Sequence, residues 1–144
     1  MMTDLSLFRF SYPVEVRYAD VDVLAHVNNA KYFTYMETAR IHYFEEVLGW
    51  DRRWETLGLI IARATCDYKL PLTYGDTALV HLRTSRIGGK SFDFEYVLVR
   101  QRDQAIAALG TTVQVAYDYA AGASVPVPDE WRSRIIAFEP ALSP

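Results

Sequence analysis

The chain has 144 residues, enough for one folded domain with its own core. Apolar residues make up 51% of it and charged residues 23%, which argues against long disordered stretches. The net charge of -3 lacks the basic surplus of a general nucleic-acid binder, and the single cysteine, Cys66, excludes an intrachain disulfide and a cysteine-based zinc site.

The first predicted element is a strand over residues 8–18, where aromatic and β-branched residues alternate with polar ones. Pro13 favours an edge position or a bulge for this strand. Residues 20–29 show no sustained period and are predicted to form a loop. Asn28 and Asn29 at its end are residue types that cap helix N-termini well.

A long helix is predicted over residues 30–48. From Tyr32 onward, apolar residues recur at steps of four, three, four and four, which is the period of a helix with one buried face. Gly49 stands where a helix C-cap favours glycine. We expect a short additional helix over residues 51–56.

Strands joined by short turns account for most of the remaining chain, which indicates antiparallel pairing. The predicted strands are residues 57–70, 77–87, 91–100 and 105–119, and a short helix is predicted over 129–138. The order predicts a single α+β domain over residues 1–144, with a five-stranded antiparallel sheet wrapped around one long central helix. One helix cannot cover the sheet edges, so we expect an edge to pair with a second copy of the chain.

Asp22 is the first candidate for chemistry, because it lies in the loop just before the long helix. A carboxylate there can attack an acyl carbon or hold a water as general base, while the first amides of the helix stabilise an oxyanion. The alternative is a solvated loop carboxylate or a cap, which is common. The same alternative applies to Asp20.

His26 is a second candidate, which would tune the carboxylate or bind substrate. A single loop histidine is more often a packing or hydrogen-bonding residue. Because His42 and His81 fall on different elements, no two histidines have metal-ligand spacing, and no metal site is predicted.

Cations gather around the predicted hairpin turn at residues 88–91, which includes Lys90 and Ser91. Phosphate binding and a solvated sheet rim both fit this pattern. The sequence contains neither a P-loop nor a dinucleotide-binding glycine motif. Glu37 and Arg40 in the helix are three residues apart and are expected to form an intrahelical ion pair.

Residues 17–33, RYADVDVLAHVNNAKYF, resemble the signature of the 4-hydroxybenzoyl-CoA thioesterase family of hotdog-fold proteins. The His-Val-Asn-Asn form at residues 26–29 is similar to the long-chain acyl-CoA thioesterase branch. Weaker similarities follow in the family's order at residues 35–40, 68–71, 74–76 and 89–92.

This resemblance implies a hotdog fold, hydrolysis of acyl-CoA without metal or bound cofactor, and a homodimer or homotetramer with active sites at the dimer interface. It assigns the catalytic carboxylate to Asp22 and the carbonyl-polarising amide to the backbone N–H of Asn29. Tyr32 would line the acyl site. Lys90 and Ser91 would contact CoA.

Two other activities remain open on this fold: an acyl-thioester hydratase or dehydratase that uses His26, and an acyl-CoA-binding domain without catalysis. The acyl group and the choice between CoA and an acyl-carrier protein are not determined. The first residues lack the pattern of a signal peptide, and no apolar run could cross a bilayer, so we expect a cytoplasmic protein.

Overall fold

The long helix forms as predicted in a computed structural model that describes residues 3–53 and 57–142. Helix α1 spans Asn29–Leu48, with Asn28 as its N-cap and Gly49 as its left-handed C-cap at φ 69°. The predicted stripe is buried against the sheet, and it consists of Tyr32, Met36, Ala39, Tyr43 and Val47.

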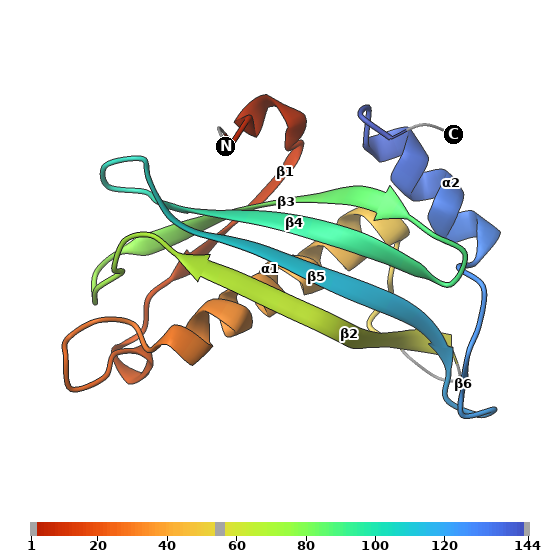
Figure 1. Cartoon of the computed structure of the whole chain (residues 1–144), viewed down its shortest axis with the longest axis horizontal. Coiled ribbons are helices and arrows are strands. Elements are labelled where there is room, and N and C mark those ends of the chain that lie inside the picture. Colours follow the sequence, from red (N-terminus) through yellow and green to blue (C-terminus); the bar gives the residue numbers. More distant parts are fainter. Residues whose placement is uncertain (1–2, 54–56, 143–144) are drawn as a thin grey trace.

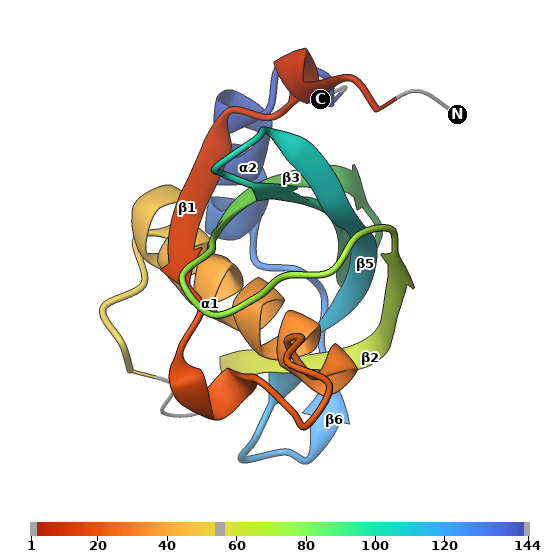
Figure 2. The same ribbon diagram turned by 90° about the vertical axis from the view of Figure 1, so that its left-hand side faces the viewer.

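The sheet is antiparallel and curls around α1, which confirms the predicted α+β fold (Figure 1 and Figure 2). Its five long strands follow the order β1-β3-β4-β5-β2, and a two-residue strand, β6, pairs with β5. The bounds are β1 Phe10–Glu15, β2 Leu57–Tyr68, β3 Thr77–Ile87, β4 Ser91–Arg100, β5 Ala105–Asp118 and β6 Ala123–Ser124.

Several local expectations need correction. The first strand ends at Glu15, and 3₁₀ helices at Leu5–Leu7 and Tyr18–Asp20 flank it. Strands β2 and β3 are consecutive in the chain but lie apart in the sheet, because β2 pairs with β5 and β3 pairs with β1. Residues 51–53 are not helical, and the rest of the helix expected there, 54–56, lies outside the described residues.

A second helix, α2 (Asp129–Phe138), packs against α1 beside β3 (Figure 1). The residue that follows it, Glu139, is 2% exposed and accepts hydrogen bonds from the Tyr43 hydroxyl (2.7 Å) and the Thr84 amide (2.6 Å). These two hydrogen bonds attach the end of α2 to α1 and β3 in the buried core. Among the described residues, no helix is both long and apolar enough to cross a membrane.

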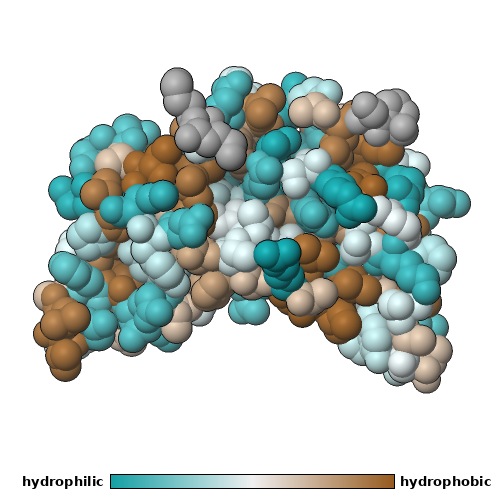
Figure 3. Space-filling model, viewed as in Figure 1, coloured by the Kyte–Doolittle hydropathy of each residue, from teal (hydrophilic) through white to brown (hydrophobic). Residues whose placement is uncertain are grey.

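Strand β2 forms one edge of the sheet, and most of its length is exposed. A bulge interrupts its pairing with β5 between Ile61 and Arg63. Ile60 and Ile61 are 39% and 43% exposed. The lower margin of the molecule is hollowed where Figure 1 places β2, and apolar surface lines part of that hollow (Figure 3). This edge has unpaired backbone groups and apolar side chains, which is the surface that an antiparallel partner strand would cover.

Candidate functional site

The loop before α1 is held by the carboxylate of Asp20, which is 1% exposed. It accepts hydrogen bonds from the backbone amide and guanidinium of Arg17, both at 3.0 Å, and from the Tyr35 hydroxyl at 2.8 Å. Burial by itself would raise the pKa of Asp20, but these hydrogen bonds outweigh it and the pKa lies below its usual value. Asp20 is therefore a buried structural anion. Of the two alternatives to a catalytic role, the solvated loop carboxylate is wrong and the cap is confirmed, because the Asp20 side chain accepts from the Arg17 amide at the start of the Tyr18–Asp20 helix.

Asp22 itself is exposed, at the start of a tight turn. One carboxylate oxygen accepts a hydrogen bond from the Leu24 amide at 2.9 Å, and the Asp22 amide donates to the carbonyl of His26 at 3.0 Å. Ala25 closes the turn in the left-handed conformation at φ 63°. This geometry fixes the carboxyl group while leaving its second oxygen available for substrate or water.

The start of α1 is fixed from two sides. The Asn28 side chain caps it by accepting from the Ala30 amide at 2.9 Å. The Tyr68 hydroxyl, at the end of β2, donates to the carbonyl of Asn29 at 2.9 Å. The Asn29 amide belongs to the first turn, whose N–H groups have no acceptor within the helix. Together with the helix dipole, this amide makes the start of α1 suited to a developing negative charge on oxygen.

A cavity of about 310 Å³ opens beside this helix start. His26, Asn29 and Tyr32 line it together with residues 68–71. Tyr32 is buried and its hydroxyl points to the carbonyl of Leu70 at 3.4 Å. Its burial raises its pKa, so the hydroxyl stays protonated near neutral pH. The structure therefore brings three of the predicted site residues into one cavity.

Asp22 lines a separate cleft next to this cavity. Its walls include Tyr18 and Tyr74, whose rings make an edge-to-face contact at 5.9 Å between centroids. Val23 and Leu24 at the tip of the same loop are 100% and 73% exposed. Figure 3 shows the resulting apolar projection at the lower left of the molecule, over the loop that precedes α1. An exposed apolar tip next to a carboxylate is typical of a surface that another molecule covers.

Lys90 and Ser91 lie far from the other site residues within one protomer. They form the β3–β4 hairpin, which is at the end of the sheet opposite to the start of α1 (Figure 1). The hairpin is well anchored, because the Gly88 amide donates to the Ser91 carbonyl at 2.7 Å and the Ala116 amide to the Lys90 carbonyl at 2.9 Å. Within one protomer, Lys90 and Ser91 therefore cannot share a site with Asp22.

Sequence reasoning did not assign the positioning roles of Asp20 and Tyr68. The available signal for Asp20 was its position, since this polar residue stands just after the alternation of the first strand ends. Tyr68 belongs to the weaker similarity at residues 68–71, but its role was not predictable because it depends on β2 running back along α1. Within residues 3–53 and 57–142, no three His, Cys, Asp or Glu side chains converge into a group suited to a metal ion.

Comparisons with known proteins agree with this fold. The family model of the thioesterase-like superfamily matches residues 16–135. A thioesterase from Thermus thermophilus, solved with coenzyme A and zinc, is 33% identical with a TM-score of 0.82, over 95% of this chain and 98% of that one. The YsmA protein of Bacillus subtilis (strain 168) is 26% identical over 129 residues, which are 90% of this chain and 86% of YsmA. A 1,4-dihydroxy-2-naphthoyl-CoA thioesterase from Synechocystis has the same fold, with a TM-score of 0.75 at 20% identity, over 88% of this chain and 94% of that one.

Proposed function

The chain belongs to the thioesterase-like superfamily, and from that membership we propose that it hydrolyses acyl-CoA thioesters to a free acid and CoA. The observation that carries the proposal is the accessible, turn-fixed carboxylate of Asp22 in the loop that leads into the start of α1, where the Asn29 amide has no acceptor within the helix. A related thioesterase with 33% identity binds coenzyme A in its structure, which supports CoA as the thiol. The form of residues 26–29 favours a fatty acyl group over 4-hydroxybenzoyl.

The proposed chemistry places the thioester carbonyl oxygen at the Asn29 amide, where the helix start stabilises the negative charge that develops during attack. Asp22 either removes a proton from a water that attacks the carbonyl carbon, or attacks it directly and forms an anhydride that water then opens. Both routes break the carbon–sulfur bond and transfer a proton to the CoA thiolate. His26 and Tyr32 contact the substrate beside the Asn29 amide.

A homodimer through β2 would complete this site. If two copies of β2 pair antiparallel, the Tyr68 end of one strand lies next to the Leu57 end of its partner. The Lys90 hairpin is at the same end as Leu57, because Ser91 pairs with Val115 and Val115 pairs with Ile60. Lys90 is then about two strand spacings, or about 10 Å, from the seam. This arrangement supplies Lys90 and Ser91 of one protomer to the CoA bound at Asp22 of the other.

The test is release of CoA from a panel of short, long and aromatic acyl-CoAs, followed with a thiol reagent. We expect turnover by the wild type and a loss of about 10²-fold or more in kcat for Asp22→Asn, the size of a general acid–base contribution. Asp129→Asn, an exposed carboxylate at the start of α2, is the matched control and should keep the wild-type rate.

The outcomes separate the alternatives. Full activity of Asp22→Asn would refute the assigned role of Asp22. Binding of acyl-CoA without release of thiol would make the chain an acyl-CoA-binding domain. Conversion of an enoyl-CoA to its hydrated form, without release of thiol, would identify a hydratase.

A further inference from the structure

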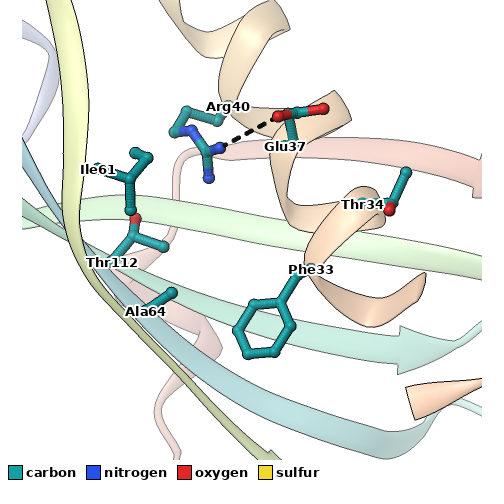
Figure 4. A pocket seen from close by; sticks show the side chains of 7 residues that line it. All are labelled: Phe33, Thr34, Glu37, Arg40, Ile61, Ala64 and Thr112. Carbon is teal, nitrogen blue, oxygen red and sulfur yellow. Dashed lines mark ion pairs between the residues drawn. The ribbon is translucent and has the colours of Figure 1, made fainter. Parts of the chain in front are cut away.

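Largely buried arginines reach three different parts of the molecule. Arg40 on α1 is 10% exposed and donates to the Tyr96 hydroxyl at 3.1 Å, beside a pocket between α1 and the strands β2 and β5 (Figure 4). Arg83 on β3 is 16% exposed and pairs with Glu95 at 2.9 Å. Arg100, the last residue of β4, is 12% exposed and reaches the wall of the cavity at the start of α1.

That wall includes the segment that follows β2. We call residues 70–72 the wall segment, and the first two of them line the cavity. α1 holds it at Leu70, whose carbonyl accepts from the Tyr32 hydroxyl at 3.4 Å. The loop before α1 holds it at Leu72, whose carbonyl accepts from the Val27 amide at 2.8 Å. The wall segment therefore contacts both the helix that bears the proposed oxyanion amide and the loop that bears the proposed catalytic carboxylate.

Arg100 holds the wall segment between these two contacts. Its Nη1 group donates to the carbonyl of Pro71, the middle residue, at 2.9 Å. Asp103 accepts two further hydrogen bonds from the guanidinium, from Nε at 3.1 Å and from Nη2 at 2.7 Å. Because a guanidinium is planar, a carboxylate that binds Nε and Nη2 also fixes the direction of Nη1. The side-chain hydrogen bonds from Arg100 lower the pKa of Asp103 to about 2, so the pair is ionised near neutral pH.

The pair also closes the turn between β4 and β5, which lies at the same end of the sheet as the start of α1 (Figure 1). The turn has support of its own, because the Gln104 side chain donates to the Gln101 carbonyl at 2.8 Å. The bond from Arg100 to Pro71 reaches a segment 29 residues earlier and adds nothing to the turn itself. Its effect is on the wall segment.

We propose that Arg100 is a positioning residue of the thioester site, which together with Asp103 holds the wall segment so that the thioester carbonyl is aligned with the Asn29 amide. The inference rests on the proposed thioesterase function and adds a pair of residues that do not touch the substrate. A displacement of about 1 Å at a reacting centre costs about 10²-fold in rate. Tyr32 and Val27 still hold the wall segment when Arg100 is replaced, so the expected loss is smaller.

The experiment measures kcat and KM on an acyl-CoA that the wild type hydrolyses. We expect Arg100→Gln to lower kcat about tenfold and to change KM less than about threefold, because alignment is lost rather than affinity. Arg100→Lys keeps the charge but lacks the planar fork, and it should not restore kcat. Arg83→Gln removes a similarly buried ion pair on β3, outside the residues that line the cavity, and should keep the wild-type kcat.

A double-mutant cycle tests whether Arg100 and Asp103 act as a unit. Asp103→Asn should lower kcat as Arg100→Gln does, although Asp103 reaches the wall segment only through Arg100. The double variant should lose no more than either single variant. Losses in kcat that multiply would show two independent effects and would refute the proposal. If Arg100→Gln does not fold, the 40% exposed Asp103 provides the milder variant, Asp103→Asn, for every comparison.

Hydrogen exchange provides a measurement that needs no turnover. The Val27 amide donates to the Leu72 carbonyl, which is next to the peptide that Arg100 holds. We expect this amide to exchange faster in Arg100→Gln than in the wild type, and at the wild-type rate in Arg83→Gln. Unchanged exchange, or full kcat in Arg100→Gln, would overturn the assignment. Absence of turnover by the wild type with every acyl-CoA would instead refute the proposed function, and the exchange rates would still decide whether Arg100 holds the wall segment.

Discussion

Replacement of Asp20 should separate stability from catalysis at this site. Asp20→Ala removes three hydrogen bonds, two from Arg17 and one from the buried Tyr35 hydroxyl, which then has no acceptor. At about 1 kcal/mol for each of the two Arg17 bonds and 1–3 kcal/mol for the orphaned Tyr35 hydroxyl, we expect a loss of about 3–5 kcal/mol in the free energy of unfolding. Asp20→Asn can keep an oxygen toward Tyr35 and the Arg17 amide, and should lose about 1–2 kcal/mol.

Urea denaturation at pH 7 measures both variants, with the exposed Asp67→Ala as a control expected within about 0.5 kcal/mol of wild type. The pKa of Asp20 is lowered by folding, so its contribution is present above its ordinary value of about 3.9 and is lost as pH falls through the folded value. The difference between wild type and Asp20→Ala should therefore shrink below pH 4. A loss under about 1 kcal/mol at pH 7, or a difference that grows in acid, would refute the role assigned to Asp20.

Three further predictions concern the edge strand, the core and the end of α2. Ile60→Lys on β2 should give the mass of a single protomer in light scattering. It should also slow CoA release, because Lys90 of the partner subunit no longer reaches the site. A dimer with full activity would contradict the proposed seam. Gly110→Val should lower the free energy of unfolding by about 1–3 kcal/mol, since a Cβ there would lie 2.3 Å from the Met36 methyl and 3.1 Å from the Thr65 carbonyl; unchanged urea midpoints would show that Met36 can move away. Burial raises the pKa of Glu139, so the folded state binds its proton more tightly and wild-type stability falls as pH rises from about 4.3 toward the folded value. Glu139→Gln lacks that loss and should gain stability relative to wild type between pH 4 and pH 7.5, whereas a pH-independent difference would argue against it.

The sequence predicts the helix and most strands well, because their signals are local. The stripe from Tyr32 to Val47 has a clear period, and the bounds of β3 and β4 coincide with their turn residues. The order of the strands in the sheet could not be predicted in this way. Whether β2 pairs with β3 or with β5 depends on contacts between distant segments, and the residues of β2 are compatible with either pairing.

The candidate site was only partly predictable for the same reason. Asp22, His26 and Asn29 lie close in sequence, so one loop and one helix start place His26 and Asn29 at one cavity and Asp22 in the cleft beside it. The burial of Asp20 was not predicted because its partner, Tyr35, is 15 residues away across a turn whose geometry the sequence does not reveal. The surroundings of Arg40 are set by Tyr96 and Thr112, on two strands far along the chain.

The bulge in β2 has a consequence for which chains can associate with this one. It falls between Ile61 and Arg63, near the middle of the 12-residue strand, so a two-fold axis there would place the bulge of each copy opposite the other. Identical chains keep the same register on both sides of the axis. A regular strand from an unrelated protein would lose its match halfway along the edge. If two copies pair through β2 as proposed, the irregularity would favour an identical strand over a regular one.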